Sequence, residues 1–284
     1  MTNTFLFLIE MNPLLRTVFL VLFFTGMFLV VFSRIWVFAE QQYAERFYRP
    51  FFRYPIIFPR NISDSAQDIL EREFTFYNQL SSADQKCFRH RLSTIMSSIE
   101  FHTKEDLELI ETMPVLISST IVMMTMGFRD YTLPNLERVV IYPGPYHSEL
   151  GDDLHKGEYS PSFKTLIFSW SDFLKGYDIT NDNLNLAIHE FSHVLHIKCY
   201  FGEDISSQIY NDGFDALKQF LRDHDAMRQA LIKTDYFRSY AFTNEVEFIA
   251  VLIECFFETP NDFKREFFEI YDLVRRMLNF RDFN

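Results

Sequence analysis

A His-Glu-Phe-Ser-His motif at residues 189–193 lies inside an apolar helical pattern and constrains the fold of this chain more than any other feature. The apolar residues around it follow the three-and-four spacing of a buried stripe: Leu184, Ala187, Ile188, Phe191, Val194 and Leu195. Because residues four apart on a helix lie one above the other, His189 and His193 point the same way. Two such imidazoles can bind one metal ion, with Glu190 beside them to take a proton from a water molecule on that ion.

The residues before the motif fit a helix that follows a strand. Thr180, Asn181 and Asp182 are candidates for the N-cap, and a β-rich run at residues 164–169 precedes the helix by about a dozen residues. A strand followed by a helix with two histidines is the arrangement that zinc peptidases use. The alternative is a core helix whose histidines are hydrogen-bonded to other protein groups, but the complete motif in register favours a metal site.

A catalytic zinc usually has three protein ligands and an open fourth position. His196 follows His193 by three residues, but it could reach the same ion only from a distorted helix. The longer motif His-Glu-x-x-His-x-x-Gly-x-x-His is absent, because His196 and Cys199 occupy the positions of its glycine and last histidine. A better source of the third ligand lies further along the chain.

The apolar segment 243–258 is that source, and we expect it to form a long, mostly buried helix. Glu247 and Glu254 are seven residues apart and therefore share one face of it. A carboxylate on an apolar helix is costly to bury unless it is paired or coordinates a metal. The alternative is an acidic, solvated face, which suits Glu245 and Glu258 better than Glu247.

The chain resembles the zinc-dependent peptidases of the Mlc titration factor A (MtfA) type over about residues 65 to 280. The resemblance rests on Val-Ile-Tyr-Pro-Gly-Pro at 140–145, Leu-Ile-Phe-Ser-Trp at 166–170, the motif at 189–193, Tyr-Ala at 240–241, and Glu-Phe-Ile-Ala-Val-Leu-Ile-Glu-Cys-Phe-Phe-Glu-Thr-Pro at 247–260. It implies an α+β, mostly helical, zincin-like metallopeptidase domain with a small sheet and an active-site helix. It also implies one zinc ion per chain, held by His189, His193 and Glu247.

The same resemblance implies roles for three residues outside the ligand set. Tyr240 would stabilise the oxyanion, although a buried tyrosine with one satisfied hydroxyl is the alternative for this residue. Glu254 would support the ligands without touching the metal, or would be purely structural. His196 stands where the family has an aspartate three residues after the second histidine. The contacts that orient the metal ligands without touching the metal are therefore expected to differ here.

The expected activity is therefore the hydrolysis of peptide bonds, with Glu190 passing a proton from the attacking water to the leaving amine. If the strand at 164–169 lies at a sheet edge, it could pair with an extended peptide substrate. A different reading is a membrane-tethered protein that sequesters a cytoplasmic transcriptional regulator, with zinc only structural, because members of the resembled family have been linked to binding a repressor of sugar uptake. The intact Glu190 favours the enzyme. A metal-free helical membrane protein is a third, minor reading.

The N-terminal part of the chain has the composition of a membrane span. Residues 17–33 carry no charge, and the run reaches Phe38 if Arg34 snorkels, so we expect one transmembrane helix over residues 14–38. A cleaved signal peptide fits less well, because the run is long and no small-x-small site follows. A buried soluble helix is disfavoured because the run has no polar face.

This span divides the chain into three expected parts. They are an N-terminal tail and transmembrane helix at 1–38, a basic and aromatic linker at 39–62, and a zinc peptidase domain at 63–284. Only Arg16 precedes the charge-free run at 17–33, whereas several arginines follow it, which predicts that the C-terminal domain faces the cytoplasm: Arg34, Arg46, Arg49, Arg53 and Arg60. Three cysteines, an odd number without metal-binding spacing, also suit a reducing compartment: Cys87, Cys199 and Cys255.

Charge separates the two ends of the protein. The whole chain has a formal charge of −12, but residues 1–60 contain six arginines against three glutamates, so the remainder has a net charge of −15. An acidic domain of this kind argues against nucleic-acid binding, which requires the neutralisation of phosphates. The basic and aromatic linker suits an anionic membrane surface, or it is simply solvated.

The remaining patterns outline the domain. Helices are expected from Ser63 onward and at 83–99 and 107–125, and strands at 139–142 and 164–169. An acidic, flexible stretch at 149–160 has two histidines at its edges, His147 and His155. These could shape a substrate cleft, although exposed loop histidines more often have no function.

Overall fold

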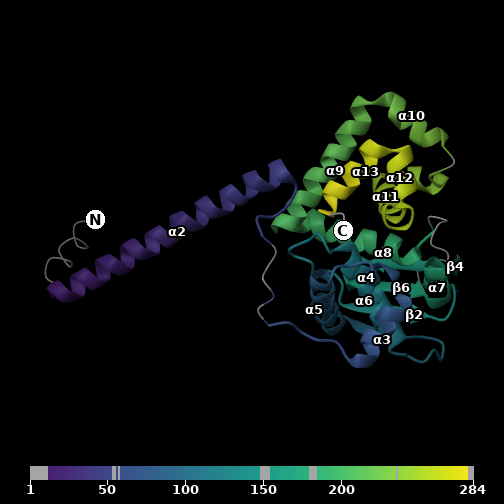
Figure 1. Cartoon of the computed structure of the whole chain (residues 1–284), viewed down its shortest axis with the longest axis horizontal. Coiled ribbons are helices and arrows are strands. Elements are labelled where there is room, and N and C mark those ends of the chain that lie inside the picture. The colour runs from purple at the N-terminus through teal and green to yellow at the C-terminus, as the bar shows by residue number, and fades with distance from the viewer. Residues whose placement is uncertain are drawn as a thin grey trace. The chain divides into compact units, whose positions relative to one another are not determined.

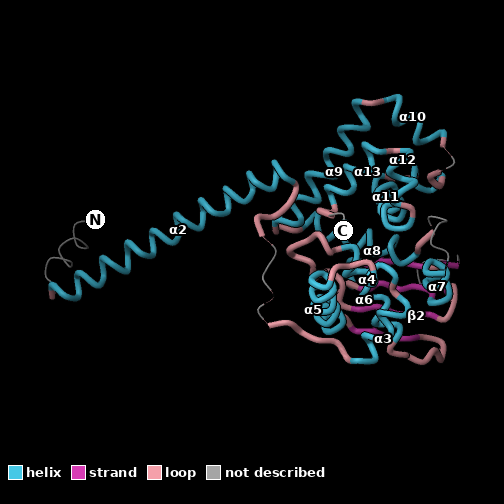
Figure 2. Tube along the Cα trace, viewed as in Figure 1, coloured by secondary structure: helices cyan, strands magenta, loops and turns pink. Residues whose placement is uncertain are grey.

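The computed structural model describes residues 12–52, 56, 58–147, 154–178, 184–234 and 236–280. The chain divides into two compact units, Met1–Phe47 and Tyr48–Asn284. The first unit contains one long helix, and the second contains a small sheet with helices around it (Figures 1 and 2). A mostly helical α+β domain was the prediction from sequence, and it is confirmed.

The first unit is built around α2 (Pro13–Phe47). All side chains of residues 12–38 are exposed, and within the described part of the chain α2 is the one helix long and apolar enough to cross a membrane. It contains the span predicted at residues 14–38. The helix then continues through residues 39–47, which belong to the segment predicted as a linker.

The second unit contains the elements that position the site. Its described helices are α3 (Asp64–Glu73), α4 (Thr75–Asn78), α5 (Ser82–Ser98), α6 (Thr112–Met124), α7 (Trp170–Asp178), α8 (Leu186–Phe201), α9 (Ile205–Asp223), α10 (Asp225–Lys233), α11 (Glu245–Glu258), α12 (Pro260–Glu266) and α13 (Phe268–Met277), with short 3-10 turns η1 (Pro161–Phe163) and η2 (Ser239–Phe242). Its described strands are β1 (Glu100–Thr103), β2 (Arg138–Tyr142), β3 (Tyr146–His147), β4 (Leu154–His155), β5 (Gly157–Ser160) and β6 (Thr165–Ser169).

A four-stranded sheet has the order β1-β2-β6-β5. Strands β1, β2 and β6 are parallel, and β5 runs antiparallel to β6, with Gly157 opposite Phe168. The inward-facing side chains of β2 and β6 are fully buried, as expected for interior strands: Val139, Ile141, Leu166 and Phe168. Strands β3 and β4 form a separate antiparallel pair.

The strand order corrects one expectation. The strand predicted at residues 164–169 is β6, but it lies between β2 and β5 and is therefore not a sheet edge. The edge next to it is β5, whose residues belong to the stretch at 149–160 that the sequence indicates is flexible; residues 149–153 lie outside the described part of the chain. The polar sequence of β5, Gly-Glu-Tyr-Ser, suits an edge strand but gives little apolar alternation by which to recognise one.

The core surrounds α8. This helix contacts α6, α7 and β5 on the side of the sheet, and α9 and α11 on the other side. Figure 1 shows α9 to α13 gathered on one side of α8, with the sheet and α3 to α6 on the other. Helix α6 is buried over almost its whole length, from Met113 to Met124. A helix fixed from both sides can hold its side chains in place for a site.

Lys198, near the end of α8, is a buried residue. Its Nζ atom donates hydrogen bonds to Asp204 Oδ2 at 2.9 Å and to Ser207 Oγ at 3.0 Å. Asp204 is also the N-cap of α9, where it accepts a hydrogen bond from the Ser207 backbone N–H. The turn between α8 and α9 therefore depends on one carboxylate that satisfies both a buried cation and a helix end.

Asp204→Ala is expected to lower the free energy of unfolding by about 3 kcal/mol at neutral pH, because it leaves a buried ammonium unpaired. Burial alone would raise the pKa of Asp204, but hydrogen bonds from Lys198 and Ser207 outweigh it and lower the pKa. The stabilisation is therefore complete above the pKa of an unfolded aspartate, about 3.9, and is lost as the pH falls through the lower folded-state pKa. Denaturation of the full chain in detergent at several pH values measures this change in the free energy of unfolding.

Asp215→Ala is the control, because it removes an exposed ion pair with Lys218 on α9 and should cost less than about 1 kcal/mol. Equal losses in both variants would contradict the prediction.

Candidate metal centre

The active-site helix predicted from the motif is α8, and it begins after the N-cap Asn185. The Asn185 side chain accepts a hydrogen bond from the Ile188 N–H at 3.1 Å and donates one to the Gly176 carbonyl at 3.0 Å. The earlier N-cap candidates, Thr180, Asn181 and Asp182, lie outside the described residues. Asn185 thus fixes both the start of α8 and its attachment to α7.

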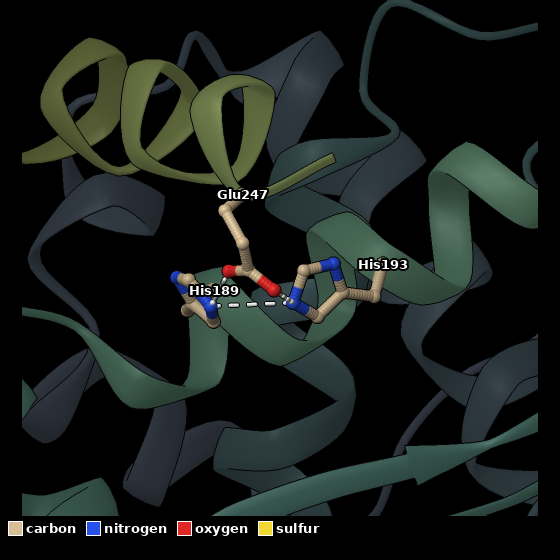
Figure 3. Close-up of side chains that lie close together, drawn as sticks. All are labelled: His189, His193 and Glu247. Atoms are coloured by element: carbon tan, nitrogen blue, oxygen red, sulfur yellow. Dashed lines mark hydrogen bonds and ion pairs between the residues drawn. The ribbon is translucent and has the colours of Figure 1, made fainter. Parts of the chain in front are cut away.

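His189 and His193 point the same way from α8, one turn apart, as their spacing predicts (Figure 3). Their Nε2 atoms are 3.2 Å apart. Glu247, in the first turn of α11, reaches between them, with Oε2 at 3.0 Å from His189 Nε2 and Oε1 at 3.6 Å from His193 Nε2. The side chains of all three are 12 to 16% exposed, so the group is largely enclosed but reachable from solvent.

The chemistry of this donor set fits a divalent metal. One ligand atom from each residue lies within 4.8 Å of the others. Two nitrogens bound tetrahedrally at about 2.0–2.1 Å from one zinc ion would be about 3.4 Å apart, close to the separation of the two Nε2 atoms. Imidazole nitrogens and carboxylate oxygens are the ligand atoms that a catalytic zinc ion takes. The residues present therefore suit the metal that the motif implies.

Glu254 fixes the tautomer of His189. Its Oε1 atom lies 2.6 Å from His189 Nδ1, so Glu254 accepts the Nδ1 proton of His189. The Nε2 lone pair then faces His193 and Glu247, which together with His189 form what we call the metal group. Glu254 is 1% exposed and also accepts hydrogen bonds from Arg238 Nη2 at 2.6 Å and from the Asn185 N–H at 3.2 Å. A carboxylate held by three such donors keeps a fixed position behind the His189 ring.

The two imidazoles differ in their electrostatic surroundings. Burial lowers the pKa of His193 to about 4, so this ring is neutral at pH 7. Burial alone would lower the pKa of His189 too, but the hydrogen bond and charge of Glu254 outweigh it and raise the pKa. Both rings can present an Nε2 lone pair to a metal, His193 because it is neutral and His189 because Glu254 accepts its proton at Nδ1.

Glu190 is also buried, at 7% exposure, and lies against β5. Burial raises its pKa to about 7. A carboxyl group with such a pKa can take and release a proton near neutral pH, which is the requirement for a general base.

Tyr240 lies in η2, with its ring centroid 6.0 Å from that of His189. Its ring is half exposed. Partial burial and the neighbouring Glu247 carboxylate raise the pKa of Tyr240, so the hydroxyl keeps its proton and can donate a hydrogen bond. This position is compatible with the role that the resemblance implies.

His196, the third histidine of α8, contacts α9. Its Nδ1 atom lies 3.3 Å from the Tyr210 hydroxyl, and its ring packs edge-on against Phe214. Both partners belong to α9. His196 therefore helps to join α8 to α9 and is not one of the three residues placed to hold a metal.

The metal group lies between two hollows that share β5 as a wall. One, of about 580 Å³, is lined by Gly157, His189, Glu190, Tyr240 and others, including His155. The other, of about 540 Å³, is lined by Tyr159, His193 and Glu247 among others. His155, unlike His147, thus borders the first hollow. An extended chain could cross the metal group from one hollow to the other along β5.

Two residues of the site were missed by sequence reasoning. Arg238 donates a hydrogen bond to Glu254 and balances its charge. A buried carboxylate does require a positive partner, but no spacing rule selects an arginine 16 residues away in a loop. Gly157 lies against Glu190, and a single glycine in a polar stretch carries no signal of its neighbour. Both contacts arise only when distant segments are packed together.

Comparison with known proteins agrees with this geometry. The model of the glucose-regulated metallo-peptidase M90 family matches residues 51–279, which include every residue of the metal group. An uncharacterized protein of Synechocystis sp. is 22% identical over 247 residues, covering 78% of this chain and 85% of that one. The match confirms the resemblance to peptidases of the Mlc titration factor A type and supports a metallopeptidase-type function. The chain belongs to the glucose-regulated metallo-peptidase M90 family.

Proposed function

We propose that this protein is a membrane-anchored, zinc-dependent peptidase in which His189, His193 and Glu247 hold the metal. The observation that carries the proposal is the convergence of two imidazole Nε2 atoms from α8 and one carboxylate from α11. Family membership supports the same reaction class. The hydrolytic role, as distinct from a structural zinc site, is supported by the carboxylate of Glu190 beside the ligands, because a structural site does not require a base.

The residues around the metal group divide the work of hydrolysis. A bound zinc ion would supply a Lewis acid and lower the pKa of a water molecule at its open position. Glu190 takes a proton from the attacking water and gives it to the leaving amine. Tyr240 donates a hydrogen bond to the oxyanion that forms on the peptide carbonyl. Glu254 and Arg238 keep His189 oriented, with its Nε2 atom toward the reacting groups.

The edge of β5 is suited to an extended peptide substrate. The hydrogen bond from the Ser169 N–H to the Lys156 carbonyl, at 2.8 Å, identifies these two residues as a hydrogen-bonded pair of the antiparallel ladder. Because such pairs alternate, the backbone N–H and C=O groups of Gly157 and Tyr159 point away from β6, toward the open edge. Gly157 borders one hollow and Tyr159 the other. A peptide that added a strand at this edge would pass the metal group.

The proposed location follows from α2 and the arginines after it. A helix of this length and composition can cross a bilayer, and the excess of arginine on its C-terminal side favours a cytoplasmic catalytic unit. The substrate would then be a cytoplasmic peptide or protein.

Removal of the metal is expected to abolish turnover of short chromogenic peptides by the full-length protein in detergent, and one equivalent of zinc should restore it. The same preparation with an inactive chelator analogue serves as the control. Turnover that survives complete metal removal would contradict the proposal. Peptide or protein binding without any turnover by the zinc-loaded protein would instead favour a sequestering protein with a structural zinc.

A further inference from the structure

Gly157 of β5 lies directly against the carboxylate of Glu190. A Cβ atom built on Gly157 would be 2.5 Å from Glu190 Oε1 and 2.8 Å from both Cδ and Cγ. Real Cβ atoms essentially never approach a neighbour closer than 3.0 Å. Position 157 therefore cannot carry a side chain while Glu190 keeps its place.

The backbone does not itself require glycine at this position. Among the described residues no glycine has a positive φ, and Gly157 is part of the regular pairing with β6, opposite Phe168. Glycine in a strand is otherwise less favourable than alanine, because it loses more conformational entropy on folding. The close approach of the Glu190 carboxylate is thus the physical reason that distinguishes glycine from alanine here.

Neither α8 nor β5 can easily move to make room for a side chain at position 157. Glu190 is 7% exposed and belongs to α8, which is packed on both sides by α6, α7, α9 and α11. Strand β5 is held by its ladder to β6. A methyl group at position 157 would therefore displace the carboxylate itself, by an amount on the order of 1 Å. A displacement of that size in a reacting group typically costs about 100-fold in rate.

We propose that Gly157 is a positioning residue of this peptidase, which sets the place of Glu190 relative to a substrate strand on β5. The inference rests on the proposed function, since it assigns Glu190 as the base. The same residue directs its backbone N–H and C=O toward the open edge, as the ladder alternation requires. One residue without a side chain thus contacts the base on one side and offers hydrogen bonds to the peptide main chain on the other. The distance from the base to the bond that is cleaved is fixed by this contact.

Gly157→Ala in the full-length protein tests the proposal. We expect kcat to fall about 100-fold, with KM within about 3-fold of wild type and one metal ion per chain retained. If Gly157 had only a structural role, Gly157→Ala would leave kcat unchanged, because alanine is more favourable than glycine in a strand with ordinary φ. Gly144→Ala is the matched control: a Cβ atom there would meet only Ser171 Oγ, at 3.9 Å, and kcat should not change.

A second background makes the steric cause visible. Glu190→Asp shortens the side chain by one methylene and makes room for a methyl group at position 157. Adding Gly157→Ala to Glu190→Asp should therefore lower kcat less than about 3-fold, against about 100-fold in the wild-type background, as expected for two residues in contact. Three results would overturn the role of Gly157 without affecting the proposed function. They are an equal loss of kcat in both backgrounds, a wild-type kcat in Gly157→Ala, and the loss of the metal ion from Gly157→Ala. A zinc-loaded wild-type chain without turnover would overturn the proposed function and this role together.

Discussion

Glu190→Gln is expected to lower kcat by about 10³-fold while the protein keeps one metal ion per chain. The amide has the size of the carboxylate but cannot accept a proton from the attacking water, and general base catalysis contributes about 10²–10⁴-fold. The metal ligands are untouched, because Glu190 lies beside the group and not within it. The measurements are kcat on a chromogenic peptide and metal content by elemental analysis.

The control for this variant is Glu137→Gln. Glu137 is an exposed residue whose partner is Lys164, so its replacement should leave kcat and metal content unchanged. Full hydrolysis by Glu190→Gln would remove Glu190 from the role of base and would leave the proposed mechanism without a proton acceptor.

Glu247→Ala is expected to weaken metal binding by far more than 100-fold, since it removes one of three ligands from a partly enclosed site. Glu254→Ala should weaken it by only about 10–100-fold, the usual effect of losing a group that orients a ligand without touching the metal. Both residues belong to α11, and both contact His189, on Nε2 and Nδ1 respectively. The pair therefore isolates direct coordination from support. Competition with a chromophoric chelator measures both affinities.

The opposite order of metal affinities in the two variants would contradict the assignment of Glu247 as the ligand. If Glu247→Ala keeps one tightly bound metal ion per chain while Glu254→Ala loses it, Glu254 is the ligand and Glu247 is not. Loss of the metal to the same extent in both variants would show that Glu254 does more than orient His189.

The parts of the site that could be predicted from sequence are those set by helical periodicity. A separation of four residues is enough to direct His189 and His193 to one side of α8. A separation of seven places Glu247 and Glu254 on one face of α11, but it does not say which of them meets the histidines. That choice depends on the crossing of α8 and α11, which brings the first turn of α11 to Nε2 and leaves Glu254 behind His189 at Nδ1.

The sheet was less accessible from sequence, because strand order is not a local property. Residues 165–169 are apolar enough to be recognised as a strand, but only the pairing of β6 with β2 on one side and β5 on the other makes it an interior strand. The true edge, β5, has a polar sequence and was not expected. Gly157 and Arg238 were missed for a related reason, because each acts on a residue that only the tertiary fold brings near.

Zinc K-edge X-ray absorption on the full-length protein with one equivalent of zinc tests the metal group most directly. We expect only nitrogen and oxygen neighbours at about 2.0–2.1 Å, with the scattering pattern of two imidazole rings from His189 and His193. A sulfur neighbour at about 2.3 Å, from Cys199 on α8 or Cys255 on α11, would contradict the assignment, as would the signal of a single imidazole.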